Sequence, residues 1–205
     1  MRSTRQCVTW QGVSVANFLR KPTLTGELVE LRPASKADAP RLHALMFDPE
    51  VSRLTGSVHS DDEASDPGWT IGQLEEVYER WSAADDRIVW AIVERATGEI
   101  VGEAVLNDLD KANRSCGFRI WISGASGRGL GTEATRLAVG HGFDDQHLNR
   151  IELEVYAFNP RARHVYEKVG FTHEGTRREA LLFNGEGVDA LVMSMLRSDW
   201  RPGSG

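Results

Sequence analysis

Apolar and polar positions follow two periods along the chain, and these periods divide it into strands and helices. Runs in which apolar residues alternate or cluster with β-branched ones predict strands at 28–33, 88–93, 100–106, 116–122, 150–156, 176–183 and 188–196. Apolar residues spaced three and four apart predict helices at 35–46, from 48 onward, and at 71–83, 130–143 and 160–169. The clearest strand is 150–156, where alternation places Ile151, Leu153 and Val155 on one face.

The order of these elements predicts a single mixed α/β (α+β) domain. Three strands that read as antiparallel neighbours precede the helix starting near 130, and a hairpin follows the helix at 160–169. We therefore expect a mostly antiparallel, twisted sheet of six to seven strands, flanked by helices, over residues 26–200. Residues 1–25 show no sustained period and are expected to form an N-terminal arm that is free to move, and 201–205 a short tail.

Composition and charge exclude several classes of function. The 205 residues carry 24 basic and 30 acidic side chains, a formal net charge of −6. This balance provides no basic stripe for nucleic acid, and it favours cationic small molecules by long-range steering. No apolar run approaches the length that spans a membrane. Neither the two cysteines, Cys7 and Cys116, nor His141 and His147 have the spacing of metal ligands, so we expect no metal and a reducing, cytoplasmic setting.

The stretch 124–134 holds four glycines between a predicted strand and a predicted helix. The start of a helix leaves backbone N–H groups without partners and carries partial positive charge, so it can bind phosphate. Residues 129–134 also match G-x-G-x-x-A, the dinucleotide fingerprint, with Glu154 at the usual separation. Antiparallel strands before the motif argue against a dinucleotide fold, and the lack of a lysine after the last glycine excludes a P-loop. A dinucleotide-dependent oxidoreductase is therefore the less favoured alternative.

Two motifs together resemble the GNAT superfamily of acyl-CoA-dependent N-acyltransferases, over about residues 26–200. Gly129-Leu-Gly131 resembles the second half of the family's [Q/R]-x-x-G-x-[G/A] pyrophosphate loop, with Ser126 where glutamine or arginine is usual. The longer stretch 127–134 is similar to the loop of the RimJ/RimL branch, which acetylates protein N-termini. The second motif, 159–171, resembles N-x-x-A-x-x-x-Y-x-K-x-G-F, with its asparagine at Asn159 and its tyrosine at Tyr166.

The resemblance implies acetyl-CoA as cosubstrate, bound where the sheet is splayed between the strand ending near 122 and the strand starting near 150. Asn159 would contact the pantetheine arm, and Tyr166 would protonate the departing thiolate, as a phenol beside a thiolate can. Arg128 or Arg163 could meet coenzyme A phosphates. The expected cofactor-binding residues are Ile120, Trp121, Ile122, Gly127, Arg128, Gly129, Leu130, Gly131, Thr132, Asn159 and Arg163.

The acceptor is expected to be a primary amine, from a small molecule or a peptide, that attacks the thioester directly. The amine must first lose a proton, and Glu154 is the favoured base, with Glu152, Glu103 or bulk water as alternatives. Cys116 has no motif base nearby, which argues against a covalent enzyme intermediate. A protein N-terminus and a small cationic amine both stay open as acceptors. A homodimer and a non-catalytic acyl-CoA-binding module stay open as well.

Overall fold

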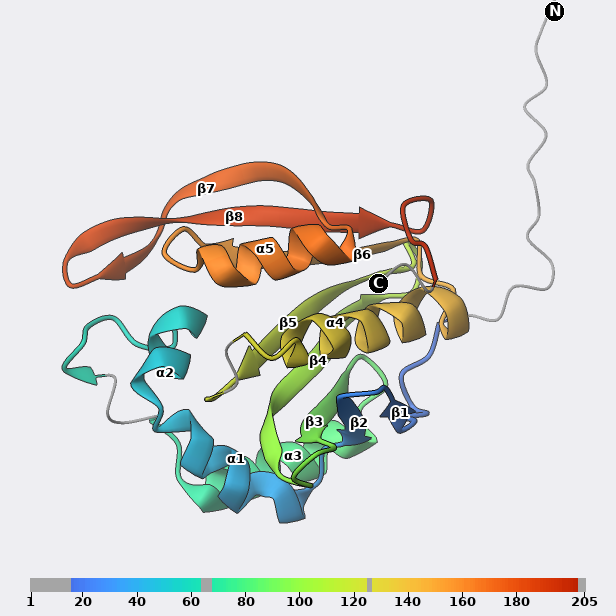
Figure 1. Ribbon diagram of the computed structural model, residues 1–205, viewed down its shortest axis with the longest axis horizontal. Helices are drawn as coiled ribbons and strands as arrows, with labels where there is room; N and C mark the ends of the chain where they lie inside the picture. The colour runs from blue at the N-terminus through green and yellow to red at the C-terminus, as the bar shows by residue number, and fades with distance from the viewer. Residues whose placement is uncertain (1–15, 64–67, 125–126, 203–205) are drawn as a thin grey trace, which may run out of the picture.

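The computed structural model describes residues 16–63, 68–124 and 127–202, which form one mixed sheet with helices on both faces (Figure 1). The strands lie in the order β1-β2-β3-β4-β5-β6-β8-β7. Their bounds are β1 Leu24–Thr25, β2 Val29–Pro33, β3 Ile88–Glu94, β4 Ile100–Asp110, β5 Ser115–Ile122, β6 Arg150–Tyr156, β7 Thr172–Phe183 and β8 Glu186–Leu196. The helices are α1 Ala39–Met46, α2 Pro49–Thr55, α3 Ile71–Ala83, α4 Leu130–Gly140 and α5 Pro160–Val169.

The sheet opens between its two central strands, β5 and β6. They pair in parallel, and the pairing joins only Ser115–Gly117 to Arg150–Glu152, whereas every other neighbouring pair of strands is antiparallel. Beyond this short ladder the strands diverge, and the β6–β8–β7 layer leans away from β5 (Figure 1). The expected splayed, mostly antiparallel sheet is therefore confirmed. It has eight described strands because the two-residue β1, too short to show a period, pairs with β2.

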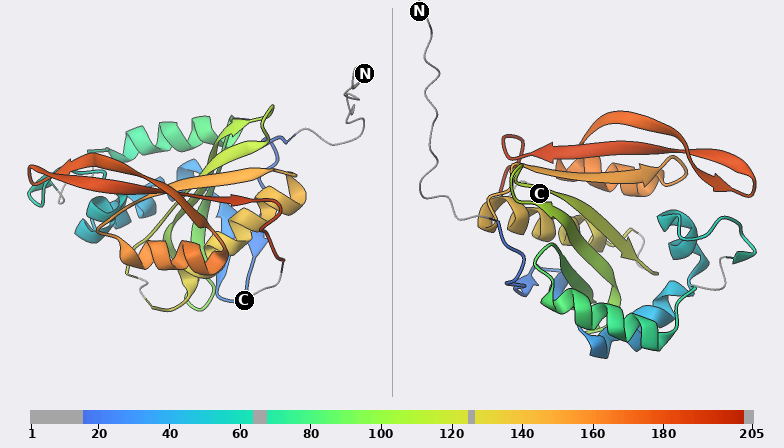
Figure 2. Two further views of the ribbon diagram at one scale, coloured as in Figure 1. Left: turned by 90° about the horizontal axis from the view of Figure 1, so that it is seen from above. Right: turned by 180° about the vertical axis from the view of Figure 1, so that it is seen from behind.

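Helices cover the two faces of the sheet unequally. Alternation along β3 turns Ile88, Trp90 and Ile92 into the main core, which α4 and α5 cover. The same alternation turns Val89 and Ala91 into a smaller core beneath α1 and α3. Viewed from above, α3 lies on one side of the sheet and α4 and α5 on the other (Figure 2, left). The opening between β5 and β6 therefore connects two faces that carry different helices.

The short helix α2 bridges the open ends of the two splayed strands. Its N-cap residue Asp48 accepts a hydrogen bond from Glu50 N at 3.0 Å and another, through its second oxygen, from Ser123 Oγ at 2.7 Å, just after β5. At its other end, Gly56 has a φ of 67°, and a Cβ there would overlap the Tyr156 ring at the end of β6. Both contacts hold α2 over the opening.

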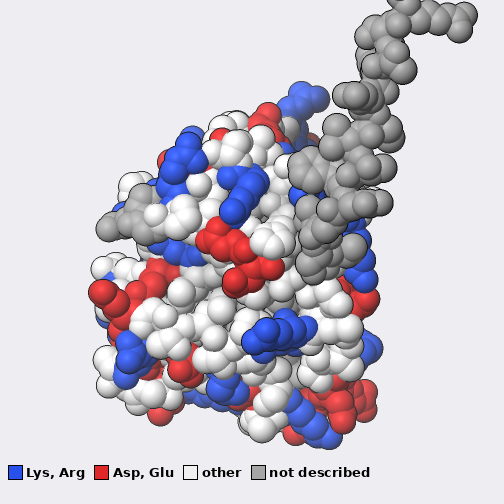
Figure 3. All heavy atoms as spheres, turned by 90° about the vertical axis from the view of Figure 1, so that its right-hand side faces the viewer, with Lys and Arg blue, Asp and Glu red and all other residues white. Residues whose placement is uncertain are grey.

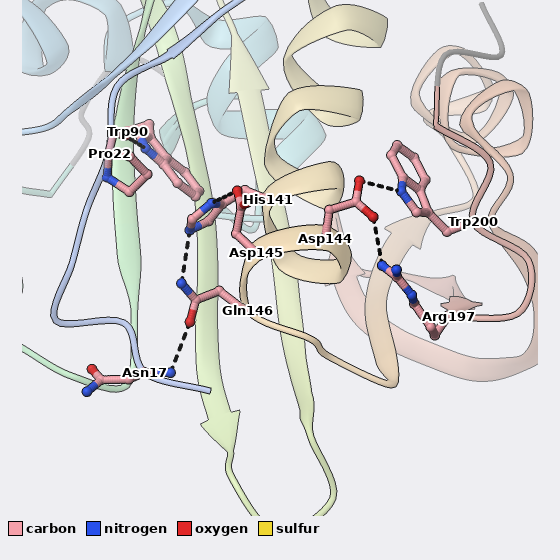
Figure 4. A network of polar contacts seen from close by, with 9 residues as sticks. All are labelled: Asn17, Pro22, Trp90, His141, Asp144, Asp145, Gln146, Arg197 and Trp200. Carbon is pink, nitrogen blue, oxygen red and sulfur yellow. Dashed lines mark hydrogen bonds and ion pairs between the residues drawn. The ribbon is translucent and has the colours of Figure 1, made fainter. Parts of the chain in front are cut away.

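The chain before β2 packs on the domain from residue 16 onward, which corrects the expectation of an arm extending to residue 25. Ala16 and Phe18 are buried in the main core. Asn17 N donates to Gln146 Oε1 at 3.0 Å, and Trp90 Nε1 donates to the Pro22 carbonyl at 2.9 Å (Figure 4). The sequence does not predict this packing, because the apolar residues of this segment follow neither the helical nor the strand period. Residues 1–15 lie outside the described part of the chain.

The end of the chain docks on the turn that follows α4. This turn, His141–Asp145, is π-helical, so the helix expected to reach 143 changes its geometry after Gly140. Asp144 accepts hydrogen bonds from Arg197 Nη1 at 2.8 Å and Trp200 Nε1 at 2.9 Å (Figure 4). The C-terminal segment up to Trp200 is therefore part of the folded domain. On this side of the molecule basic and acidic side chains are interspersed (Figure 3).

Candidate active site

A cleft of about 790 Å³ occupies the opening between β5 and β6. Residues 117–122 of β5 and 152–156 of β6 form its walls. α2 contributes residues from one side of the sheet, while the start of α4 and most of α5 contribute from the other. Segments more than a hundred residues apart in the sequence thus meet in one cavity.

The glycine loop ends at the start of α4, inside this cleft. Gly129 is the N-cap of α4 with a φ of 82°, and Gly129, Gly131 and Thr132 all line the cavity. No described side chain caps this helix, so the amides of its first turn keep their N–H groups for a ligand. A backbone N–H cluster at a helix start fits a diphosphate without a side chain in the way. Gly127, at a φ of 77°, lines the same edge.

Asn159 connects β6 to α5 and lines the cleft. Its Oδ1 accepts a hydrogen bond from Ala162 N at 3.0 Å, which makes it the N-cap of α5. The amide oxygen is therefore used by the fold, whereas Nδ2 has no hydrogen bond to the described residues. The contact to a pantetheine arm stays a prediction.

Tyr166 projects from α5 into the closed part of the cleft. Its side chain is 6% exposed, and its ring packs edge-on against Phe118 at 6.4 Å and Phe171 at 5.9 Å between centroids. Burial raises the pKa of the Tyr166 phenol, and no described ionisable group opposes that rise. The hydroxyl is therefore protonated across the physiological range and can serve as an acid, not as a base.

Three carboxylates were candidates for the base, and they occupy different surroundings. Glu154 and Glu152 both line the cleft and form ion pairs, Glu154 with Arg177 at 2.6 Å and Glu152 with Arg150 at 2.9 Å. Glu103 lies on β4 behind the cleft wall.

The Glu103 carboxylate is enclosed by the smaller core. It accepts a hydrogen bond from the Tyr78 hydroxyl at 2.6 Å, and burial raises its pKa while Tyr78, Arg119 and Trp121 act to lower it. It does not line the cavity, so it has no direct access to an acceptor.

Two arginines expected to meet coenzyme A phosphates form ion pairs in the structure, and their contact with a phosphate stays a prediction. Arg128 forms an ion pair with Glu94 at the end of β3, and Arg163 pairs with Glu167 one helical turn on at 2.8 Å. Neither lines the cleft, nor does Leu130, whose side chain is buried in the main core. Glu94 is distant from Arg128 in the sequence, whereas Arg163 and Glu167 have the i,i+4 spacing of neighbours on one helix face. Ser126 lies outside the described residues.

A basic stripe on α5 lines the cleft where those arginines do not. Arg161, His164 and Lys168 lie three and four residues apart, so they share one face of the helix, and all three line the cavity. The spacing was visible in the sequence and would have identified them. Ile120, Trp121 and Ile122 line the opposite wall as expected.

Neither a metal site nor a membrane helix is found among the residues that the structure describes. No group of three or more His, Cys, Asp or Glu there could hold a metal ion. None of the helices in 16–63, 68–124 and 127–202 has the length and apolar character to cross a bilayer.

Comparison with known proteins identifies the family. The model of the acetyltransferase (GNAT) domain matches residues 29–172. The chain belongs to the GNAT acetyltransferase family. Putative ribosomal N-acetyltransferase YdaF of Bacillus subtilis is 33% identical to it over 104 residues, 50% of this chain and 57% of that protein. Spermidine N(1)-acetyltransferase of Escherichia coli is 28% identical over 173 residues, 84% of this chain and 88% of that protein.

The fold of this GNAT protein also matches solved structures. The spermidine N-acetyltransferase from Vibrio cholerae in complex with CoA and spermine has a TM-score of 0.74 to it at 24% identity, covering 85% of this chain and 98% of that one. Membership of the GNAT acetyltransferase family confirms the expectations of a GNAT domain, of N-acetyl transfer to an amine and of acetyl-CoA as cosubstrate. The RimJ/RimL branch is only one of the branches that the relatives leave open, because spermidine and ribosomal N-acetyltransferases both occur among them.

Proposed function

We propose that this protein moves the acetyl group of acetyl-CoA to a primary amine by direct attack inside the β5–β6 cleft. The observation that carries the proposal is that one cavity brings together the uncapped start of α4, Asn159 and the buried hydroxyl of Tyr166. An acetyl donor with a diphosphate and an amide-rich arm is the ligand that this combination fits.

The proposed donor site follows the two walls of the cleft. The amides of Leu130, Gly131 and Thr132 would receive the diphosphate, and the basic stripe on α5 would meet the remaining phosphate charge. The backbone of 120–122 would pair with the amide-rich arm, because β5 has no strand partner on this side beyond Gly117.

Tyr166 is the proposed acid in the transfer step. The neutral amine attacks the thioester carbonyl, the C–N bond forms, the C–S bond breaks, and the thiolate takes its proton from the Tyr166 hydroxyl. The phenolate then regains a proton from the acceptor's nitrogen or from water, so atoms and charge balance. The raised pKa keeps the phenol protonated before the reaction, and the same water-poor surroundings raise the proton affinity of the thiolate that forms beside it.

Glu154 is the proposed acceptor of the proton that the ammonium loses. It lines the cleft from β6, and Arg177 is bonded to Oε1, which leaves Oε2 for a proton or a bridging water. Bulk water is the alternative proton acceptor. An unchanged rate of acetyl transfer in Glu154→Gln would favour water.

The relatives' names point to two classes of acceptor, the small amine spermidine and a ribosomal acceptor. We propose a primary amine as the acceptor, and a RimJ/RimL-like role, in which that amine is a protein N-terminus, is one form of this proposal. We also propose that the protein assembles as a homodimer, and a measurement of its mass in solution tests this.

The test separates acetyl transfer from the alternatives. Acetyl-CoA and coenzyme A should raise the melting temperature while NADH and NADPH should not, because a ligand that binds only the native state stabilises it by mass action. Thiol release from acetyl-CoA across a panel of amines should then fall ~100-fold or more in Tyr166→Phe with similar KM values. Stabilisation by NAD(P)H alone would contradict the proposal, and stabilisation by acetyl-CoA without turnover of any amine would favour a binding module.

A further inference from the structure

Arg119 of β5 lines the cleft on the face of the strand opposite the donor site. On β5, Phe118 is buried in the main core and Ile120 packs against it, on the side of α4 and α5. Alternation turns Arg119 to the other side, where its register partner Val105 packs against the smaller core. Arg119 is exposed and lines the cavity. It therefore faces the side from which an acceptor enters.

The acidic side chains of the same cavity already have basic partners. The ion pairs are Glu50 with Arg161 at 3.1 Å, Glu152 with Arg150 at 2.9 Å, Glu154 with Arg177 at 2.6 Å and Asp108 with Arg87 at 3.9 Å. Arg119 differs from the arginines in these pairs, because within the described ranges it makes neither a hydrogen bond nor an ion pair. Its guanidinium therefore keeps five N–H donors for a ligand.

The negative charge that interacts with Arg119 comes from Glu103. Glu103 lies on the neighbouring strand β4, two residues before Val105, the register partner of Arg119. It interacts electrostatically with Arg119 but is not within ion-pair distance. Its carboxylate is buried and accepts the Tyr78 hydroxyl at 2.6 Å, and burial raises its pKa, which reduces the negative charge that it presents. Arg119 thus presents on the acceptor side a positive charge that has no ion-pair partner among the described residues.

We propose that Arg119 binds a carboxylate of the acceptor, so that the substrate is an amine carrying a carboxylate, such as an amino acid or short peptide, and not a bare polyamine. This inference rests on the proposed acetyl transfer and narrows its acceptor. A guanidinium binds a carboxylate through two parallel N–H···O bonds, whereas it repels an ammonium. Donor phosphates have their own cations on α5, on the opposite side of the sheet.

The test uses acceptors that differ only in the carboxylate. A series of ω-amino acids of increasing length, each paired with the n-alkylamine of equal length, and dialanine paired with its C-terminal amide are compared by thiol release. Wild-type protein should prefer the carboxylated partner by ~10-fold or more in kcat/KM at the best length. Arg119→Gln should reduce that ratio to about 1, Arg119→Lys should retain part of it, and the affinity for acetyl-CoA should stay unchanged.

A matched control is Arg178→Gln, which removes the same charge from an exposed position of β7 outside the cavity and should leave the ratio unchanged. Equal or better turnover of the alkylamines by wild-type protein, or an unchanged ratio in Arg119→Gln, overturns the assignment while acetyl transfer stands. Calorimetric titration of the same compounds into the coenzyme A complex gives a second readout. If no amine is acetylated, the proposed transfer fails, and Arg119 is then judged by whether carboxylated compounds bind and lose affinity in Arg119→Gln.

Discussion

A single methyl group added to Gly102 should displace the donor wall of the cleft. Gly102 lies on β4 opposite Ile122, and a Cβ built on it would stand 2.1 Å from the Trp121 carbonyl oxygen and 2.9 Å from Ile122 Cα. Both are backbone atoms, so no side chain can turn aside to make room. The strand itself must move.

The size of the effect follows from these contacts. Real Cβ atoms essentially never approach closer than 3.0 Å, so β5 would have to shift by roughly 1 Å at Trp121. Since 120–122 line the cleft, a misplacement of ~1 Å there should cost ~100-fold in acetyl transfer and at least ~10-fold in affinity for acetyl-CoA. Overpacking should also lower the free energy of unfolding by ~1–3 kcal/mol.

Gly102→Ala is measured by calorimetric titration with acetyl-CoA, with circular dichroism and thermal melting to confirm the fold. Gly175→Ala on β7 is the matched control, because a Cβ there meets nothing within 4 Å. The reasoning is refuted if Gly102→Ala binds acetyl-CoA as tightly as wild type, or if Gly175→Ala loses the same affinity.

Two further substitutions test how the site is held. Glu133, in the first turn of α4, accepts the backbone N–H groups of residues 27, 28 and 29 at 2.7–2.8 Å, and a Cβ on Gly26 would overlap its carboxylate. Glu133→Gln removes a carboxylate oxygen that accepts these N–H groups, so the affinity for acetyl-CoA should fall ~10-fold. The turnover of acetyl-pantetheine, which has no diphosphate, should stay unchanged. Equal losses with both acetyl donors would show a general defect of the protein. Burial lowers the pKa of His141, despite its 2.8 Å contact with Asp145 (Figure 4), so the folded protein resists its protonation. The stabilising effect of neutral His141 is complete above the unfolded pKa of ~6.5 and is lost as pH falls below it. His141→Leu should therefore show a smaller drop in melting temperature than wild type on acidification, and parallel curves would contradict this.

Local patterning predicted most of the architecture. The strict alternation of 150–156, the helical spacing of 71–83 and the proline after Asp48 each determine an element from neighbouring residues alone, and each appears where expected. The splay was inferred from motif resemblance, and its extent is set by the three-residue ladder between β5 and β6.

The remaining features depend on residues that meet only in the fold. Phe18 has no apolar neighbours at a regular spacing, yet the core excludes water from it completely. Arg128 pairs with Glu94, which lies 34 positions away in the sequence, so only the fold brings the two side chains together. The Arg161 to Lys168 stripe is the exception, since its helical spacing was readable in advance.

The most direct test of acetyl transfer by direct attack is the mass of protein and amine after a single turnover. Cys116 is buried and free, and burial raises the pKa of its thiol, so it provides no thiolate nucleophile. Protein mixed with acetyl-CoA alone should keep its mass, and addition of a competent amine should yield the acetylated amine and free thiol in equal amounts. An acetyl group found on the protein before the amine is added, and passed on from there, would contradict direct attack.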